Sequence, residues 1–302
     1  MASIITYQQC PCCGSTHIAP QLKAIDYTVS KDLFDIWHCN DCTLRFTQNV
    51  PDEDSIGPFY QSTSYVSHSD TQEGFINKLY HRVRNFTLNQ KRKLIIDATQ
   101  TTDGNLLDVG AGTGAFSNEM NQSGWQVTGL EPDTTARQVA LNKFGLQLDE
   151  PEKLFSLPAN TFDAITMWHV LEHVHNLHGY LEQYHKILKP NGRLIIAIPN
   201  YTSYDAQHYN EYWAAYDVPR HLYHFSPKSM DTLAVLKGFK IEAYKPMWFD
   251  SFYVSMLSEK YKTGKDNHPK AVWNGFLSNL KALGNSKLCS SVIYVLAKDA
   301  TG

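Results

Sequence analysis

The feature that most constrains the fold of this chain is a run of three glycines directly behind a short apolar stretch. Residues 106–116 read Leu-Leu-Asp-Val-Gly-Ala-Gly-Thr-Gly-Ala-Phe, with glycines at positions 110, 112 and 114. Glycine lets the backbone turn sharply and lets a ligand approach where a Cβ would obstruct it. A helix that follows such a turn offers unpaired N–H groups at its start. The segment therefore predicts a buried strand, a ligand-binding turn and a helix.

The rest of the chain from residue 105 alternates apolar runs of strand length with segments of helical length. The expected strands cover residues 106–109, 126–130, 145–148, 162–168, 193–198, 239–246 and 291–298. The expected helices cover residues 134–144, 177–188 and 226–238, with a turn at 189–192. This alternation predicts an α/β fold, a Rossmann-like and largely parallel sheet with helices on both faces.

Two acidic residues flank the glycine turn. Glu131 ends the second expected strand, 21 residues after Gly110, where a carboxylate can accept hydrogen bonds from both hydroxyls of a ribose. The glycines alone also fit a dinucleotide fingerprint, so an NAD(P)-binding oxidoreductase is an alternative. Asp108 disfavours that alternative, because an acid before the first glycine opposes a pyrophosphate but suits an ammonium group.

Together these motifs resemble those of the class I S-adenosylmethionine-dependent methyltransferases. Residues 107–114 are similar to the first motif of that family, and Glu131 resembles its ribose-binding acid. Residues 162–174 and 188–199 resemble the later motifs on the fourth and fifth strands, so the likeness covers about residues 100–300. The resemblance implies S-adenosylmethionine as cofactor and a seven-stranded sheet whose last strand is antiparallel. It also implies that the adenine lies near residues 149–151.

The predicted cofactor site follows from these motifs. Asp108 and the glycines are expected to hold the aminoacyl end of the cofactor, and Trp168 to line its pocket. The full set is Asp108, Gly110, Ala111, Gly112, Gly114, Glu131, Pro132, Glu150 and Trp168. A second alternative is a non-catalytic cofactor-binding or interaction protein on the same fold, since these residues indicate binding rather than turnover.

Four cysteines form two Cys-x-x-Cys pairs near the start of the chain, Cys10 with Cys13 and Cys39 with Cys42. In a reducing compartment this arrangement predicts metal ligation, and four thiolates suit tetrahedral, structural zinc. A redox pair would sit at a helix start in a βαβ unit, which is absent here. Cys12 competes with Cys13, although Cys10 and Cys13 give the regular spacing. The segment resembles the zinc-ribbon leader found on some members of the superfamily.

Three units follow along the chain. Residues 1–50 are expected to form the zinc-ribbon-like module, and residues 99–302 the methyltransferase domain. Residues 51–98 are expected to form a linker and a helix that covers the cofactor. The linker, residues 51–70, looks irregular, and apolar residues at helical spacing predict the helix over 72–98.

A cluster of ionisable side chains follows the fourth expected strand. His169, Glu172 and His173 stand at positions i, i+3 and i+4, and would share one face of a helix. Such a face can bind a divalent cation or position a base. A similar Glu-x-x-Glu-His cluster binds metal in small-RNA 2′-O-methyltransferases and resembles that of ubiquinone-pathway O-methyltransferases. Here His169 replaces the first Glu, and we favour a packing and capping role.

An aromatic-rich segment, residues 201–225, follows the fifth expected strand at the carboxyl edge of the sheet, where ligands bind in such folds. Aromatic side chains with polar tips suit an acceptor pocket or lid. Arg220 is expected to hold an anionic part of the acceptor. His169 and His221 are the candidate catalytic bases.

Charge and hydropathy limit the kinds of partner that we expect for this chain. The net charge of −3 and the lack of a basic cluster near the cysteines disfavour nucleic acid. The chain shows no signal peptide and no run approaching about 18 apolar residues, so we expect a cytoplasmic protein without membrane insertion. The sequence thus predicts methyl transfer to a small-molecule or biosynthetic acceptor, with oxygen favoured over nitrogen and carbon. It leaves the acceptor and the oligomeric state open.

Overall fold

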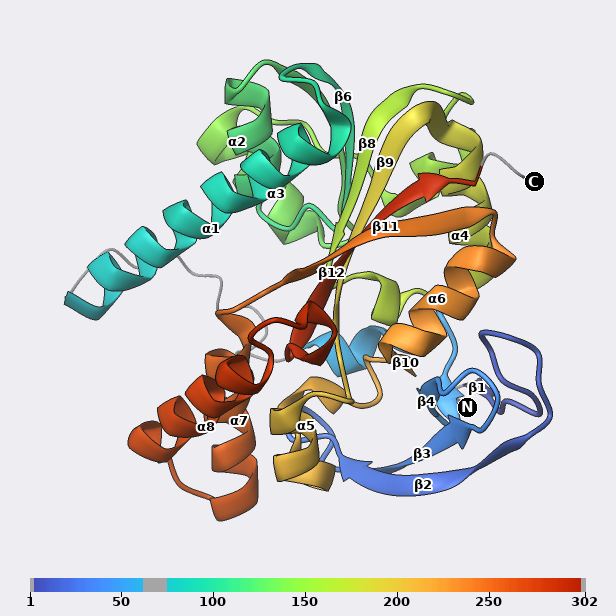
Figure 1. Ribbon diagram of the computed structural model, residues 1–302, viewed down its shortest axis with the longest axis vertical. Coiled ribbons are helices and arrows are strands. Elements are labelled where there is room, and N and C mark those ends of the chain that lie inside the picture. The colour runs from blue at the N-terminus through green and yellow to red at the C-terminus, as the bar shows by residue number, and fades with distance from the viewer. Residues whose placement is uncertain (1–2, 62–74, 300–302) are drawn as a thin grey trace.

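A computed structural model describes residues 3–61 and 75–299, with only the backbone for residues 75–83 (Figure 1). Parts of two expected segments, the irregular stretch from residue 62 and the helix start at 72–74, lie outside the described residues. The side chains of Phe75, Leu79 and Val83, which contribute to the predicted helical period, lie outside them as well.

A mixed sheet forms the centre of the molecule, with strand order β11-β12-β9-β8-β6-β7. Its strands are β6 Gly104–Val109, β7 Trp125–Leu130, β8 Phe162–Trp168, β9 Leu188–Pro199, β11 Phe239–Pro246 and β12 Ser291–Lys298. Strands β7, β6, β8 and β9 are parallel, and β12 runs antiparallel to both of its neighbours. The predicted α/β class and the antiparallel last strand are therefore confirmed.

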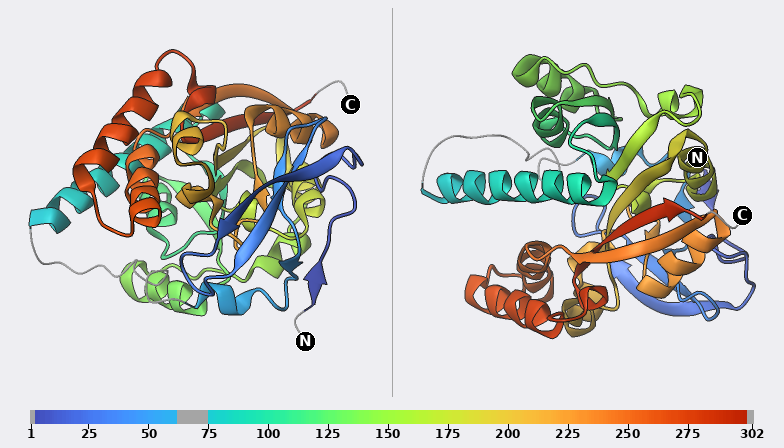
Figure 2. Two further views of the ribbon diagram at one scale, coloured as in Figure 1. Left: turned by 90° about the horizontal axis from the view of Figure 1, so that it is seen from below. Right: turned by 45° about the horizontal axis from the view of Figure 1, so that its top comes forward.

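Helices cover both faces of this sheet, as the two views in Figure 2 show. The described helices are α1 Phe75–Thr99, α2 Ala115–Gln122, α3 Thr134–Phe144, α4 Leu177–Ile187, α5 Tyr204–Tyr209, α6 Pro227–Leu236, α7 Asp250–Thr263 and α8 His268–Lys281. Of these, α5, α7 and α8 pack on one another below the sheet in Figure 1. Successive strand residues belong to different hydrophobic clusters: Leu107 packs in the cluster that contains α4 and α6 residues, and Leu106 in the one that contains Ile95 of α1 and Met120 of α2. This alternation follows from the period of two in a strand. No described helix has the length and apolar character needed to cross a membrane.

The expected third strand is not formed. Residue Gly145 ends α3 in the left-handed conformation, and a 3-10 helix begins at Pro151, so little chain is left for a ladder. A single bridge between Leu130 and Asp149 remains, and the described sheet has six strands where seven were expected. The expected turn at 189–192 lies within β9, where the register shifts: Leu188 pairs with Phe162 and Arg193 with Ala164, and the residues between them have no partner in β8.

The N-terminal segment forms a second, antiparallel sheet with the order β10-β4-β3-β2. Strands β2 Ile18–Ile25, β3 Leu33–Cys39 and β4 Arg45–Thr47 come from the first fifty residues. The edge strand β10, Tyr223–His224, comes from the aromatic-rich segment and pairs with β4. A separate two-stranded pair joins β1 Ile4–Ile5 to β5 Val50–Pro51. The boundary that we expected at residue 50 is therefore crossed by strand pairing.

The glycine turn offers a matched test of close packing. At Gly110 the φ angle is +71° and an added Cβ would lie 2.3 Å from Val170 Cγ2, whereas at Gly112 the φ angle is +55° and the space is open. We expect Gly112→Ala to lower the free energy of unfolding by about 1–2 kcal/mol, the cost of the left-handed backbone. Gly110→Ala should lower it by about 2–5 kcal/mol, because overpacking adds to that cost. Urea denaturation without cofactor measures both, and equal losses would contradict the close approach.

Candidate active site and cysteine cluster

The glycine turn is tied to the end of the neighbouring strand. The N–H groups of Gly110 and Ala111 both donate to the Leu130 carbonyl, at 2.8 and 2.9 Å. Gly114, with a φ angle of 76°, then serves as the N-cap of α2. The turn, the start of α2 and the end of β7 thus form one rigid corner at the carboxyl edge of the sheet.

Glu131 lies at the rim of this corner and is 8% exposed. Its Oε2 accepts from the N–H of Gly112 at 2.7 Å, and its Oε1 from the N–H of Asp133 at 3.0 Å. Burial raises the pKa of this carboxyl, although the two backbone donors act in the opposite direction. The arrangement places Glu131 directly beside the turn, as the predicted ribose contact requires.

The predicted cofactor contacts that follow Glu131 in the chain have different surroundings. The carbonyl of Pro132 accepts a hydrogen bond from Arg137 at 2.9 Å. Asp149 bridges to Leu130, so the segment expected near the adenine does lie next to the end of β7. The Glu150 side chain, however, is 69% exposed and pairs with Arg137 at 2.8 Å. Its carboxylate is therefore already engaged with Arg137, whose side chain is only 16% exposed.

Asp108 is buried behind the turn, with 1% of its surface exposed. Its Oδ2 accepts from the Ser117 hydroxyl at 2.7 Å and its Oδ1 from the Thr166 hydroxyl at 2.9 Å. Burial raises the pKa of the carboxyl, while the two hydroxyls and the nearby Lys91 lower it. Asp108 is thus a fixed acidic group at the base of the corner.

Lys91 of α1 lies beside the predicted site, a position that sequence reasoning did not anticipate. Its Nζ lies 4.1 Å from the centroid of the Trp168 ring, whose edge in turn meets Phe116. Burial lowers the pKa of Lys91 to about 8, against the opposing effect of Asp108 and Asp250. A lysine on an amphipathic helix ordinarily faces water, so the sequence alone gave no sign of this position.

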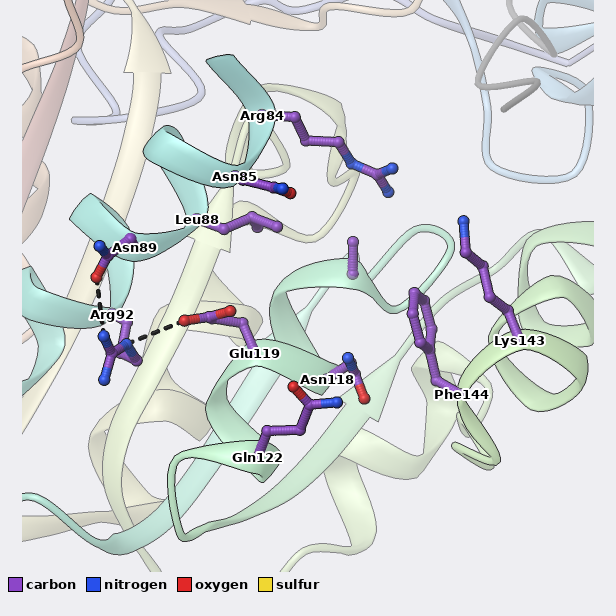
Figure 3. Close-up of a pocket in the computed structure, with 11 residues that line it drawn as sticks. Arg84, Asn85, Leu88, Asn89, Arg92, Asn118, Glu119, Gln122, Lys143 and Phe144 are labelled. Atoms are coloured by element: carbon purple, nitrogen blue, oxygen red, sulfur yellow. Dashed lines mark hydrogen bonds and ion pairs between the residues drawn. The ribbon is translucent and has the colours of Figure 1, made fainter. Parts of the chain in front are cut away.

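An open pocket of about 620 Å³ lies beside this corner, between α1, α2 and the end of α3 (Figure 3). It is lined by Arg84, Asn85, Leu88, Asn89, Arg92, Ala115, Asn118, Glu119, Gln122, Lys143 and Phe144. Arg92 and Glu119 form an ion pair across it at 3.0 Å. None of the predicted cofactor residues lines the pocket, although Ala115 directly follows Gly114. The pocket therefore adjoins the predicted site and does not contain it.

His169 does not share a helical face with Glu172 and His173. It has a φ angle of 58°, and only Leu171–His173 form a short 3-10 turn. Its Nε2 lies 2.8 Å from Asp250 Oδ2, and its Nδ1 lies 3.4 Å from Glu172 Oε1. Burial disfavours the charged ring, but the two carboxylates outweigh it and raise the pKa of His169 to about 10. At neutral pH His169 is therefore an imidazolium and a poor base.

The second candidate base, His221, is buried against the same turn. It is 9% exposed, its Nδ1 lies 2.8 Å from the Ala215 carbonyl, and its ring centroid lies 4.6 Å from that of His173. Burial and the charge of His221 lower the pKa of His173 to about 4, so the His173 ring is neutral. Glu172, His173 and His221 each offer one ligand atom within 4.8 Å of the others.

Arg220 is not available to an acceptor, and that prediction is wrong. Its side chain is fully buried and pairs with Asp26 at 2.9 Å and with Asp217 at 2.6 Å. It also donates to the Phe59 carbonyl at 2.8 Å. Several aromatic side chains of the same segment are buried as well, namely Tyr201, Tyr209, Trp213, Tyr216 and Tyr223. Much of residues 201–225 is therefore packed core.

The four expected cysteines do come together in the N-terminal sheet. Sγ of Cys10 lies 3.5 Å from Sγ of Cys42, and Sγ of Cys13 lies 3.6 Å from Sγ of Cys39. A tetrahedral zinc ion with Zn–S bonds of about 2.3 Å separates its sulfurs by about 3.8 Å, so the cluster fits zinc. The fifth cysteine, Cys12, is fully buried and directs its Sγ to the Ser229 carbonyl, 3.7 Å away.

This geometry predicts which substitutions release metal. We expect Cys39→Ser to reduce the bound zinc by one equivalent per chain, because three thiolates no longer close the tetrahedron. Cys12→Ser is the matched control and should leave the zinc content unchanged. Elemental analysis of the purified proteins measures both, and loss of zinc from Cys12→Ser alone would overturn the ligand set.

Comparison with known proteins identifies the family. A family model described as "Methyltransferase domain" matches residues 79–244. A ubiquinone biosynthesis O-methyltransferase of Nitrosococcus oceani is 29% identical over 175 residues, which cover 53% of this chain and 72% of that protein. A demethylmenaquinone methyltransferase of Tropheryma whipplei is 36% identical over 95 residues, 30% of this chain and only 40% of that protein.

The fold is shared with a solved enzyme as well. The phosphoethanolamine N-methyltransferase 2 of Haemonchus contortus, in complex with S-adenosyl-L-methionine, superposes with a TM-score of 0.52 and is 15% identical. The match covers 84% of this chain and 63% of that one. The family model spans more than half of the 302 residues and contains the glycine turn and Glu131. The chain belongs to the family of S-adenosylmethionine-dependent methyltransferases.

Proposed function

We propose that this protein transfers the methyl group of S-adenosylmethionine to a hydroxyl oxygen of a small-molecule acceptor. The observation that carries the choice of oxygen is the likeness to the ubiquinone biosynthesis O-methyltransferase, which extends over 72% of that relative. A hydroxyl acceptor must lose its proton, a step that the polar group formed by Glu172, His173 and His221 beyond the end of β8 can assist. Methyl transfer itself is an in-line displacement at carbon, so the enzyme mainly positions donor and acceptor.

In this proposal the corner at the glycine turn holds the cofactor. Glu131 accepts hydrogen bonds from the ribose hydroxyls, and Asp108 lies on the side of the ammonium group. Lys91 pairs with the carboxylate of the same aminoacyl end. The support for Lys91 is its partly buried position: among the described residues no carboxylate or carbonyl forms a hydrogen bond with its ammonium, and desolvation lowers its pKa to about 8. An anionic ligand would compensate that buried charge.

The role of Lys91 predicts a pH dependence of cofactor binding. Below about pH 8 the ammonium is charged and pairs with the carboxylate, and above that pH it loses its proton and the pair is lost. The affinity should therefore fall by up to about tenfold per pH unit above pH 8. Lys91→Arg stays cationic and should show only the titration of the cofactor's own amino group, whose pKa is about 7.7–8.0. Calorimetric titration at pH 7 and pH 9 measures the difference between the two proteins.

Two neutral variants complete that test at pH 7. Lys91→Gln should weaken binding by about tenfold or more, since a hydrogen bond to a charged group contributes about 1.5–3 kcal/mol. Lys93→Gln removes an exposed lysine from the same helix and should bind as the wild type does. Identical pH profiles for wild type and Lys91→Arg would remove Lys91 from the site.

The acceptor atom is tested directly. The protein is incubated with S-adenosylmethionine and a panel of phenols, catechols, hydroquinones and sugars, and the new methyl group is located by NMR. We expect an O-methyl product, and a product methylated only at carbon or nitrogen would overturn the proposal. His221→Ala should lower turnover by about 100-fold and leave the dissociation constant of the cofactor nearly unchanged, because the proposed acceptor and cofactor contacts lie on different residues.

A further inference from the structure

The group formed by Glu172, His173 and His221 has the composition of a metal site. We propose that these three residues bind one divalent transition-metal ion, separate from the ion of the cysteine cluster. One ligand atom from each residue lies within 4.8 Å of the other two. The set replaces the one expected from sequence spacing, because His221 takes the position that we had considered for His169.

The Glu172 carboxylate is the first argument. Its side chain is fully buried, and neither carboxylate oxygen accepts a hydrogen bond. A buried charge without hydrogen bonds is costly, and such groups are ordinarily paired or coordinate a metal. His169 supplies a positive charge 3.4 Å from Oε1, but its ring lies closer to Asp250, at 2.8 Å. The Glu172 carboxylate therefore has an ion-pair partner, but no described hydrogen-bond donor occupies its oxygen lone pairs.

The tautomers of the two histidines are the second argument. Nδ1 of His221 lies 2.8 Å from the Ala215 carbonyl, and Nδ1 of His173 lies 3.1 Å from both the Arg220 carbonyl and the Tyr60 hydroxyl. A carbonyl oxygen only accepts, so these contacts favour a proton on Nδ1 of each ring, and a ring that carries its one proton there keeps its lone pair on Nε2. Metal-bound histidines are held in the same way, with the second nitrogen donating to a carbonyl or carboxylate.

The donor set defines the class of ion. Two imidazole nitrogens and one carboxylate oxygen suit zinc, iron, manganese or cobalt, whereas magnesium and calcium prefer oxygen ligands alone. Three protein ligands leave coordination positions open, unlike the closed set of four cysteines. An oxygen atom of the acceptor could occupy such a position, a reading that rests on the proposed transfer to oxygen.

Cobalt distinguishes the two sites by their spectra. The full chain is produced in minimal medium with Co²⁺ in place of Zn²⁺ and dialysed, and its cobalt content and absorption are measured. We expect two Co²⁺ ions per chain, of which one gives the intense near-ultraviolet thiolate-to-cobalt band. A content of one ion per chain, accounted for by the thiolate band, would overturn the proposal.

Substitutions assign each ion to its ligands. Glu172→Gln should lose the ion that gives no thiolate absorption and keep the thiolate band. Cys39→Ser should lose the thiolate band and keep the other ion. His268→Gln, an exposed histidine at the start of α8, is the control and should keep both ions. Retention of both ions by Glu172→Gln would refute the site, and His221→Gln provides the same test if Glu172→Gln does not fold. Two bound ions together with methylation at carbon or nitrogen would refute only the choice of oxygen.

Discussion

The buried guanidinium of Arg220 joins three parts of the chain that are distant in sequence. It reaches Asp26 in the N-terminal sheet, the Phe59 carbonyl and Asp217 in the aromatic-rich segment. A buried charge is tolerated only when its partners are in place, so each of these segments depends on the presence of the others. The Arg220 carbonyl also faces Nδ1 of His173. The same residue thus links the assembly of the N-terminal sheet to the orientation of a candidate ligand.

Much of the fold was readable from local patterns. Strands β11 and β12 have the predicted bounds, and the helix expected from residue 226 begins directly after Ser226, whose hydroxyl caps it. Each Cys-x-x-Cys turn is visible in the sequence, and the antiparallel pairing of β2 with β3 brings the two turns together. These features depend on neighbouring residues or on a short period, and both are visible in one sequence.

The features that sequence reasoning missed depend on contacts between distant residues. Arg220 and His221 are adjacent in the chain and looked alike as pocket residues, yet Arg220 is anchored by Asp26, 194 positions away. Lys91 and Asp250 belong to helices with no local motif, and only the packing of α1 and α7 brings them near Trp168 and His169. The missing third strand reflects how little chain separates Gly145 from Pro151.

The pairing of β10 with β4 constrains how such a protein can evolve. A chain that lost its first fifty residues would leave Tyr223–His224 as a lone strand without a neighbour and Arg220 without Asp26. An uncovered strand edge is a template for aggregation. The leader and the enzyme therefore cannot be exchanged independently by recombination at residue 50. Either the two are inherited together, or a substitute leader must supply both an edge strand and a buried acid.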